Sequence, residues 1–245
     1  MKQLSSQQKK LVQDAALAVL AVILVSTLSL GGWIDYLNGN LFDLLVTTRH
    51  AAPEHRDDIV FATIDQNSIT YFNEHNGVSW PWPRVFYARL LRHLADCGAR
   101  VVVFDIIFSE EDVDRTGEER DASDNEFARA IAETKIAVLA VSDQRDPSRW
   151  SVPDRVDWPL DDTVPFDRCT AVMDYRNELL PYYMFLESTP GLGFVTMTPE
   201  RDGIHRRYPV VSRVGGKLVP SLALTAAKRF LSPEEYHQRV RDPMA

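Results

Sequence analysis

The residues best suited to chemistry in this chain lie at the ends of two apolar runs. Asp65 ends the run 59–65, and Asp105 ends the run 101–105. If both runs are parallel strands, their carboxyl ends meet at one edge of a sheet, where ligand crevices form. Two carboxylates there would bind a cation or a ligand amine. Capping of the following helix, or pairing with an arginine, is the plainer interpretation and the one that we favour.

A stiff aromatic segment, Trp80-Pro81-Trp82-Pro83-Arg84, lies between the two runs. Each proline fixes its own φ and discourages helix in the residue before it, which predicts an extended loop. Arg84 is the natural partner for either aspartate, and its guanidinium can also stack on a tryptophan. We expect either a ligand platform or rigid packing that fixes the next helix. The candidate ligand-binding residues are Asp65, Ser68, Trp80, Trp82, Arg84 and Asp105.

Other motifs do not indicate catalysis. Residues 77–81 lack the second glycine of a nucleophile elbow, and residues 191–193 lack the third glycine of a dinucleotide loop. The acidic stretch 110–126 begins like a calcium loop at Asp112, but its twelfth position is Ser123 rather than a bidentate glutamate. We interpret this stretch as a solvated acidic loop. We therefore predict no catalytic residue, no metal and no cofactor.

Composition is that of a globular protein. The chain has 245 residues, of which 45% are hydrophobic and 25% charged. Its net charge of -8 argues against a nucleic-acid partner, which needs a basic surface. Two cysteines, Cys97 and Cys169, are too few for a disulfide scaffold or a cysteine zinc site. We expect Cys97 to be a small buried thiol at a helix end, and one disulfide between the two stays open.

Residues 15–34 carry no charge and as a helix would span about 30 Å, the thickness of a bilayer core. Lysines precede this run, and no basic residue follows it until Arg49, which predicts a cytoplasmic N-terminus. The alternative is a cleaved signal peptide, for which the run is long. We expect a cytoplasmic tail over 1–14, one transmembrane helix over 15–34 and an extracytoplasmic domain over 35–245.

The first part of that domain predicts an α/β fold. Strands are expected over 59–65, 100–108 and 136–141. A helix with a 3.6-residue apolar period begins at Val85 and ends before Gly98, and a second covers 124–134. Connections of helix length imply a parallel β-α-β-α-β core within a mixed sheet.

The second part predicts an antiparallel meander and a helix. Residues 143–190 are rich in proline and aspartate and read as a long irregular excursion, with one short strand at 170–173. Strands are expected over 194–198, 204–213 and 217–219. Ser221 should cap the N-terminus of a final helix.

In order along the chain, these features resemble the type-two CHASE domain, a sensory module found outside the membrane in bacterial adenylate cyclases and histidine kinases. The Trp-Pro segment and residues 104–108 are rather specific when they occur together. The matching segments are 42–45 with Arg49, 58–68, 80–84 with Tyr87, 98–110, 124–128, 202–210 and 220–224.

The resemblance implies a sensor without catalysis of its own, which acts as a homodimer on an unknown extracytoplasmic signal. In the family, further membrane helices and a cyclase or kinase output domain usually follow, and this sequence stops before either. Two alternatives stay open: an anchored metal-dependent hydrolase that uses Asp65 and Asp105, and a structural assembly module whose aromatic loop is an interface.

Overall fold

A computed structural model describes residues 6–49, 58–112, 121–143, 173–175, 178–214 and 217–231. The chain divides into two compact units, Met1–Thr63 and Ile64–Ala245.

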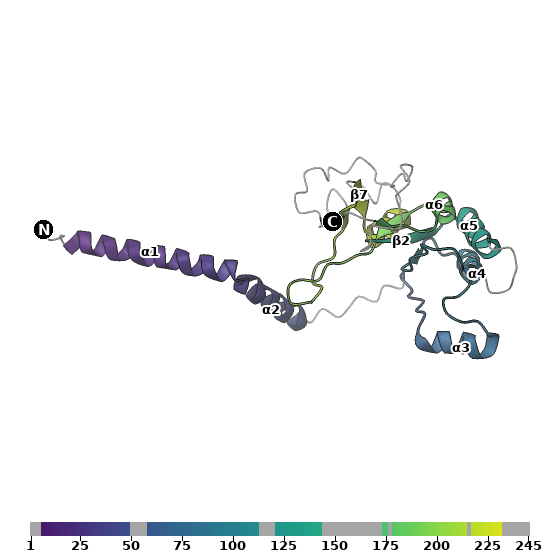
Figure 1. Cartoon of the computed structure of the whole chain (residues 1–245), viewed down its shortest axis with the longest axis horizontal. Coiled ribbons are helices and arrows are strands. Elements are labelled where there is room, and N and C mark those ends of the chain that lie inside the picture. Colours follow the sequence, from purple (N-terminus) through teal and green to yellow (C-terminus); the bar gives the residue numbers. More distant parts are fainter. Residues whose placement is uncertain are drawn as a thin grey trace. The chain divides into compact units, whose positions relative to one another are not determined.

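The first unit consists of two helices, α1 (Ser6–Leu30) and α2 (Trp33–Thr48) (Figure 1). They are separated at Gly31-Gly32, where Gly32 takes a left-handed φ of 74° that glycine adopts at little cost. In the described part of the chain, we find no helix with both the length and the apolar character needed to cross a membrane. The transmembrane helix expected over 15–34 stays a prediction.

The strand expected over 59–65 is a correction. Residues 59–65 form no strand or helix, and both Val60 and Phe61 are 87% exposed. An apolar run becomes a strand only where a neighbouring strand satisfies its backbone groups, and no strand of the described residues pairs with this one. The run ends at α3 (Gln66–Asn76).

A parallel sheet lies at the centre of the second unit. β1 (Val102–Phe104), β2 (Ala137–Asp143) and β5 (Leu192–Phe194) pair in parallel, with Val102 opposite Ala137 and Leu139 opposite Leu192. The first five residues of β2 are buried, as expected of a central parallel strand. β4 (Glu178–Leu179) extends the sheet by antiparallel pairing with the end of β2. The parallel core is therefore confirmed, but its third strand is β5 and not the run before α3.

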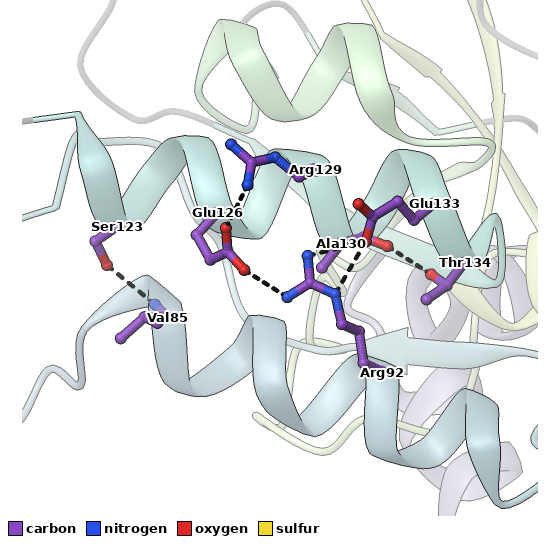
Figure 2. Close-up of polar contacts among 8 residues, drawn as sticks. All are labelled: Val85, Arg92, Ser123, Glu126, Arg129, Ala130, Glu133 and Thr134. Carbon is purple, nitrogen blue, oxygen red and sulfur yellow. Dashed lines mark hydrogen bonds and ion pairs between the residues drawn. The ribbon is translucent and has the colours of Figure 1, made fainter.

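Two helices cover the core, one before β1 and one between β1 and β2. α4 (Arg84–Asp96) precedes β1, and α5 (Ala122–Thr134) joins β1 to β2. Figure 2 shows them side by side and running in the same direction. α4 ends as predicted, because Gly98 has a φ of 88° and its N–H donates to the carbonyl of Ala95.

Aromatic rings fill the space beneath the helices. Their centroids lie 5.1 to 6.3 Å apart, mostly edge to face, which is the favoured geometry for such pairs. One ring comes from α6 (Tyr183–Ser188), inside the region expected to be irregular. The rings belong to Tyr87, Phe104, Phe108, Phe127 and Phe185.

The C-terminal hairpin and helix follow the prediction, but the three-stranded antiparallel meander is a correction. The strand expected over 194–198 is β5, which ends at Phe194 and pairs in parallel with β2. β6 (Val211–Val214) and β7 (Lys217–Pro220) pair antiparallel, and β3 (Asp174–Tyr175) adds to β6 in parallel. The strand expected over 204–213 is shorter, since residues 204–210 form no strand. Ser221 caps α7 (Leu222–Phe230) by accepting the N–H of Leu224 at 3.1 Å.

β5 and α7 approach each other so closely that position 193 must be glycine. A Cβ at Gly193 would overlap the backbone of Leu222, so only glycine lets the strand pass the start of α7. Cys97 departs from expectation because it is exposed at the end of α4, where it is a free thiol. Cys169 lies outside the described residues.

Candidate functional site

Asp65 and Ser68 form a helix cap. Asp65 precedes α3 and accepts both the N–H of Ser68 at 2.8 Å and its hydroxyl at 2.6 Å. These hydrogen bonds stabilise the carboxylate and hold the pKa of Asp65 below its usual range. The Asp-x-x-Ser spacing therefore has a structural use, as the plainer interpretation of Asp65 proposed.

The Trp-Pro segment has one exposed and one buried tryptophan. Trp80 is 44% exposed, whereas Trp82 is 8% exposed and packs 4.5 Å from the ring of Phe72 in α3. The two indoles meet edge to face at 5.7 Å. Among the described residues, the indole N–H of Trp82 has no hydrogen-bond partner. Trp82 thus anchors α3 to the core, and Trp80 stays accessible.

Arg84, the first residue of α4, points into the domain. It is 9% exposed, and its guanidinium carbon lies 4.8 Å from the centre of the Phe108 ring. Nη2 donates to the carbonyl of Glu110 at 3.3 Å, and Nε lies 3.8 Å from Oδ1 of Asp124. The expectation that Arg84 pairs with Asp65 or Asp105 is therefore wrong, because its carboxylate partner is Asp124 on α5.

The same region caps the backbone of α4 from a distance. The first N–H groups of a helix have no partner within it, and Pro83 offers no side-chain cap. The N–H of Arg84 donates to Oδ2 of Asp112 at 2.8 Å, and that of Val85 donates to the hydroxyl of Ser123 at 3.0 Å (Figure 2). The start of α4 is thus fixed by Asp112 and Ser123, which lie 28 and 38 positions further along the chain.

Asp124 completes the connection between these segments. Its side chain is 0% exposed, and Oδ2 accepts the N–H of Asp112 at 2.9 Å. Burial is the main influence on this carboxyl and raises its pKa, against the opposing effects of the Asp112 N–H and the Arg84 charge. Part of the acidic stretch is therefore structural, and the interpretation of that stretch as solvated is wrong for Asp112 and Asp124. Residues 113–120 lie outside the described residues.

A second charged cluster joins the same helices nearer the surface. Arg92 of α4 reaches Glu126 at 2.6 Å and Glu133 at 2.9 Å, both on α5. Arg129 adds a contact of 3.1 Å to Glu126 (Figure 2). Hydrogen bonding to Arg92 is the main cause that lowers the pKa of Glu126. Its exposed position makes this cluster a surface feature rather than a site.

The structure therefore separates the six predicted site residues. Trp80, Asp65 and Asp105 are exposed, and Ser68 is half-buried, whereas Trp82 and Arg84 are buried in internal contacts. No hydrogen bond or ion pair among the described residues joins Arg84 to Asp65 or Asp105. The described residues also hold no group of three or more metal-ligating side chains placed to share an ion. Binding of a ligand by these residues stays a prediction.

Sequence reasoning missed Asp124, although a signal was present. Asp124, Phe127, Ala128 and Ile131 share the i, i+3, i+4, i+7 spacing of one helix face. All four are buried. A carboxylate on an apolar face needs a cationic partner, and that requirement pointed to a buried arginine.

Comparison with known proteins gives one match. The family model of the CHASE2 domain matches residues 17–243, which is nearly the whole chain. No curated protein and no solved structure matches it. The matched span contains the capped α3, the Trp-Pro segment and the parallel sheet. The chain therefore belongs to the CHASE2 domain family, whose members are sensory domains of signalling proteins.

Proposed function

We propose that this chain is a membrane-anchored extracytoplasmic sensor of a bacterial receptor of the cyclase or kinase type. The observation that carries the proposal is the CHASE2 match over residues 17–243. The uncharged run 15–34, preceded by lysines, supports an anchor with its N-terminus in the cytoplasm. On this proposal the α/β domain binds the signal, and the resulting conformational change is transmitted to the membrane through the N-terminal helices.

The accessible members of the predicted site are the best candidates for contact with the signal. Trp80 offers an exposed aromatic face, and Asp65 and Asp105 offer exposed carboxylates. Trp82 and Arg84 would then transmit a change rather than contact the ligand, because both are packed inside the domain. A ligand shifts the equilibrium only by its different affinity for the two states.

The other functions considered have less support. Asp65 is engaged as the cap of α3, which weakens a hydrolase that depends on Asp65 and Asp105 with a metal. An assembly module would need an interface, and Trp80 is the exposed tryptophan of the Trp-Pro segment that would contribute to it. Homodimerisation is part of the proposal, because two-state signalling through a single helix is simplest between paired chains.

Topology is tested with the exposed thiol of Cys97. In a chain carrying Cys169→Ser, a membrane-impermeant maleimide added to intact bacterial cells should label Cys97. The chain should also stay in the membrane after carbonate extraction. The additional substitution Cys97→Ser is the control and should abolish labelling. Labelling only after lysis, or extraction into the soluble fraction, would contradict the anchored extracytoplasmic sensor.

The ligand face is tested by a thermal-shift screen of the full chain against small molecules. Trp80→Ala and Asp105→Asn should each remove the shift given by a ligand found in this way. Arg89→Ala, an exposed change on the outer side of α4, is the matched control and should keep it. If both site variants bind as the unchanged chain does, the signal binds elsewhere.

A further inference from the structure

The two oxygens of the buried Asp124 carboxyl have unequal surroundings. Oδ2 accepts the N–H of Asp112 at 2.9 Å. Oδ1 has no hydrogen-bond partner among the described residues, and neither has Nε of Arg84, which lies 3.8 Å away. A buried ion pair that lacks a hydrogen bond recovers little of the cost of removing both charges from water.

Among the described residues, three charged groups act on Asp124, and they come from three segments. Arg84 on α4 favours the carboxylate. Asp112 after β1 and Asp121 before α5 carry like charges and favour the neutral acid, as burial does. Together these influences raise the pKa of Asp124, so that a proton reaches this carboxyl before it reaches an ordinary aspartate.

We propose that Arg84 and Asp124 form an acid-operated latch, in which uptake of one proton by Asp124 releases Arg84 together with the Trp-Pro segment. The proton binds a carboxylate oxygen and gives a neutral carboxylic acid, while the guanidinium keeps its charge. Arg84 is then left with the carbonyl of Glu110 and the ring of Phe108 as its closest described side-chain contacts. A buried cation without a counter-charge is unfavourable, so the side chain moves toward water.

Release of Arg84 loosens the start of α4. The bond from the Asp112 N–H to Oδ2 loses its charge assistance when Asp124 is neutral. Asp112 in turn accepts the first N–H of α4, so the loop after β1 and the entry of the helix change together. Trp82 lies two residues before Arg84 and packs on Phe72, which carries the change to α3.

The biological role of the latch rests on the proposed sensor function, because an extracytoplasmic domain is exposed to the pH of the cell's surroundings. The latch predicts a signal of known chemistry, the proton, acting on a defined pair. Its test is independent of topology. A chain that fails to be anchored can still open with acid, and an anchored chain can prove insensitive to it.

Hydrogen–deuterium exchange of the full chain, followed from neutral pH downward through the raised pKa of Asp124, tests the latch. Exchange rates are divided by the intrinsic rate at each pH. Once Arg84 has left, the still-buried Asp124 lacks the charge that lowered its pKa, so the pKa is higher in the open form and opening takes up a proton. We therefore expect the backbone amides of Arg84, Val85 and Asp112 to lose protection as pH falls, by at most about tenfold for each pH unit, over the range between the pKa values of Asp124 in the closed and open forms. Asp124→Asn should show low protection of these amides at every pH. Glu126→Gln, two residues along α5, is the matched control and should behave as the unchanged chain.

Each outcome decides the proposal. Protection at Arg84 and Val85 that stays constant with pH in the unchanged chain overturns the latch, whatever the variants do. A pH-dependent loss that persists in Asp124→Asn overturns it as well, because the proton then acts elsewhere. If Asp124→Asn does not fold, Asp124→Glu takes its place. That variant keeps a titrating group and should move the midpoint, and an unmoved midpoint counts against the proposal.

Discussion

Two clusters join the helices α4 and α5. Each pairs an arginine with a carboxylate, but the two differ in burial and in distance. Near the helix starts, Arg84 and Asp124 are buried and 3.8 Å apart. Further along, Arg92 and Glu126 are partly exposed and 2.6 Å apart. The pKa of Asp124 is raised by burial, whereas the pKa of Glu126 is lowered by its hydrogen bond to Arg92. The comparison shows that burial, more than pairing with an arginine, decides in which direction the pKa of a carboxyl group moves.

The buried cluster also does more for the architecture. It holds the loop after β1, the start of α4 and the start of α5 through Asp112, Arg84 and Ser123. The exposed cluster connects only the two helices, by side chains that water can also solvate. The Trp-Pro segment ends at Arg84 and places the side chain of this arginine in the interior of the domain.

The largest predicted effect is that of Arg84→Ala. The substitution leaves Asp124 buried without a counter-charge, which costs about 3–5 kcal/mol of unfolding free energy at neutral pH. The cost should shrink in acid, because a protonated Asp124 needs no partner. Thermal and chemical unfolding of the full chain measure it, and Arg84→Lys, which keeps a charge, should lose less. A loss below about 1 kcal/mol would mean that the pair is not a buried unit.

The next largest effect is expected for Ser123→Ala, which removes the acceptor of the Val85 N–H. An orphaned N–H at a half-buried helix start costs about 1–2 kcal/mol. Ser123→Thr keeps the hydroxyl and should lie close to the unchanged chain in the same unfolding measurement. Equal losses for both variants would indicate packing rather than capping.

Arg92→Ala should have the smallest effect on stability. Exposed ion pairs contribute about 0.2–1 kcal/mol, and salt screens them. Unfolding at low and high ionic strength should show a small loss that disappears with salt. Arg89→Ala on the same helix serves for comparison. A loss as large as that of Arg84→Ala would remove the distinction between the two clusters.

The two carboxylates should also respond oppositely to pH. The pKa of Glu126 is lowered from 4.5, so its contribution is present above that value and is lost as pH falls through the folded pKa. The pKa of Asp124 is raised from 3.8, so its ionised form weakens the fold and the penalty is relieved as pH falls through the raised value. Against global unfolding, in which both carboxylates regain their ordinary pKa values, the unchanged chain should therefore weaken in acid relative to Glu126→Gln and strengthen relative to Asp124→Asn. Differences of the same sign would contradict the assigned shifts.

Much of the fold could be predicted because its signals are local. The apolar period of α4 and α5, the glycine after α4 and the serine before α7 are all patterns within a few residues. The buried run of β2 likewise identified a central strand. The run 59–65 has the same local pattern as a strand, yet its pairing depends on a neighbour that local pattern does not supply.

The site was harder to predict because its contacts are long-range. The capping role of Asp65 could be anticipated from Ser68 three residues away. The partner of Arg84 lies 40 positions along the chain, on a helix whose acidic start looks solvated. Only the placement of Asp124 on the apolar face of α5 indicated that this carboxylate is buried. The high charge of the surrounding stretch obscured that pattern.

The central claim is that Asp124 holds Arg84 inside the domain, and a double-mutant cycle tests it most directly. Arg84→Ala, Asp124→Ala and the double variant give a coupling free energy from unfolding at neutral pH, to be compared with the same cycle for Arg92 and Glu126. We predict a coupling of about 2 kcal/mol or more for the buried pair and below about 1 kcal/mol for the exposed pair. A buried-pair coupling no larger than that of the exposed pair would contradict the account.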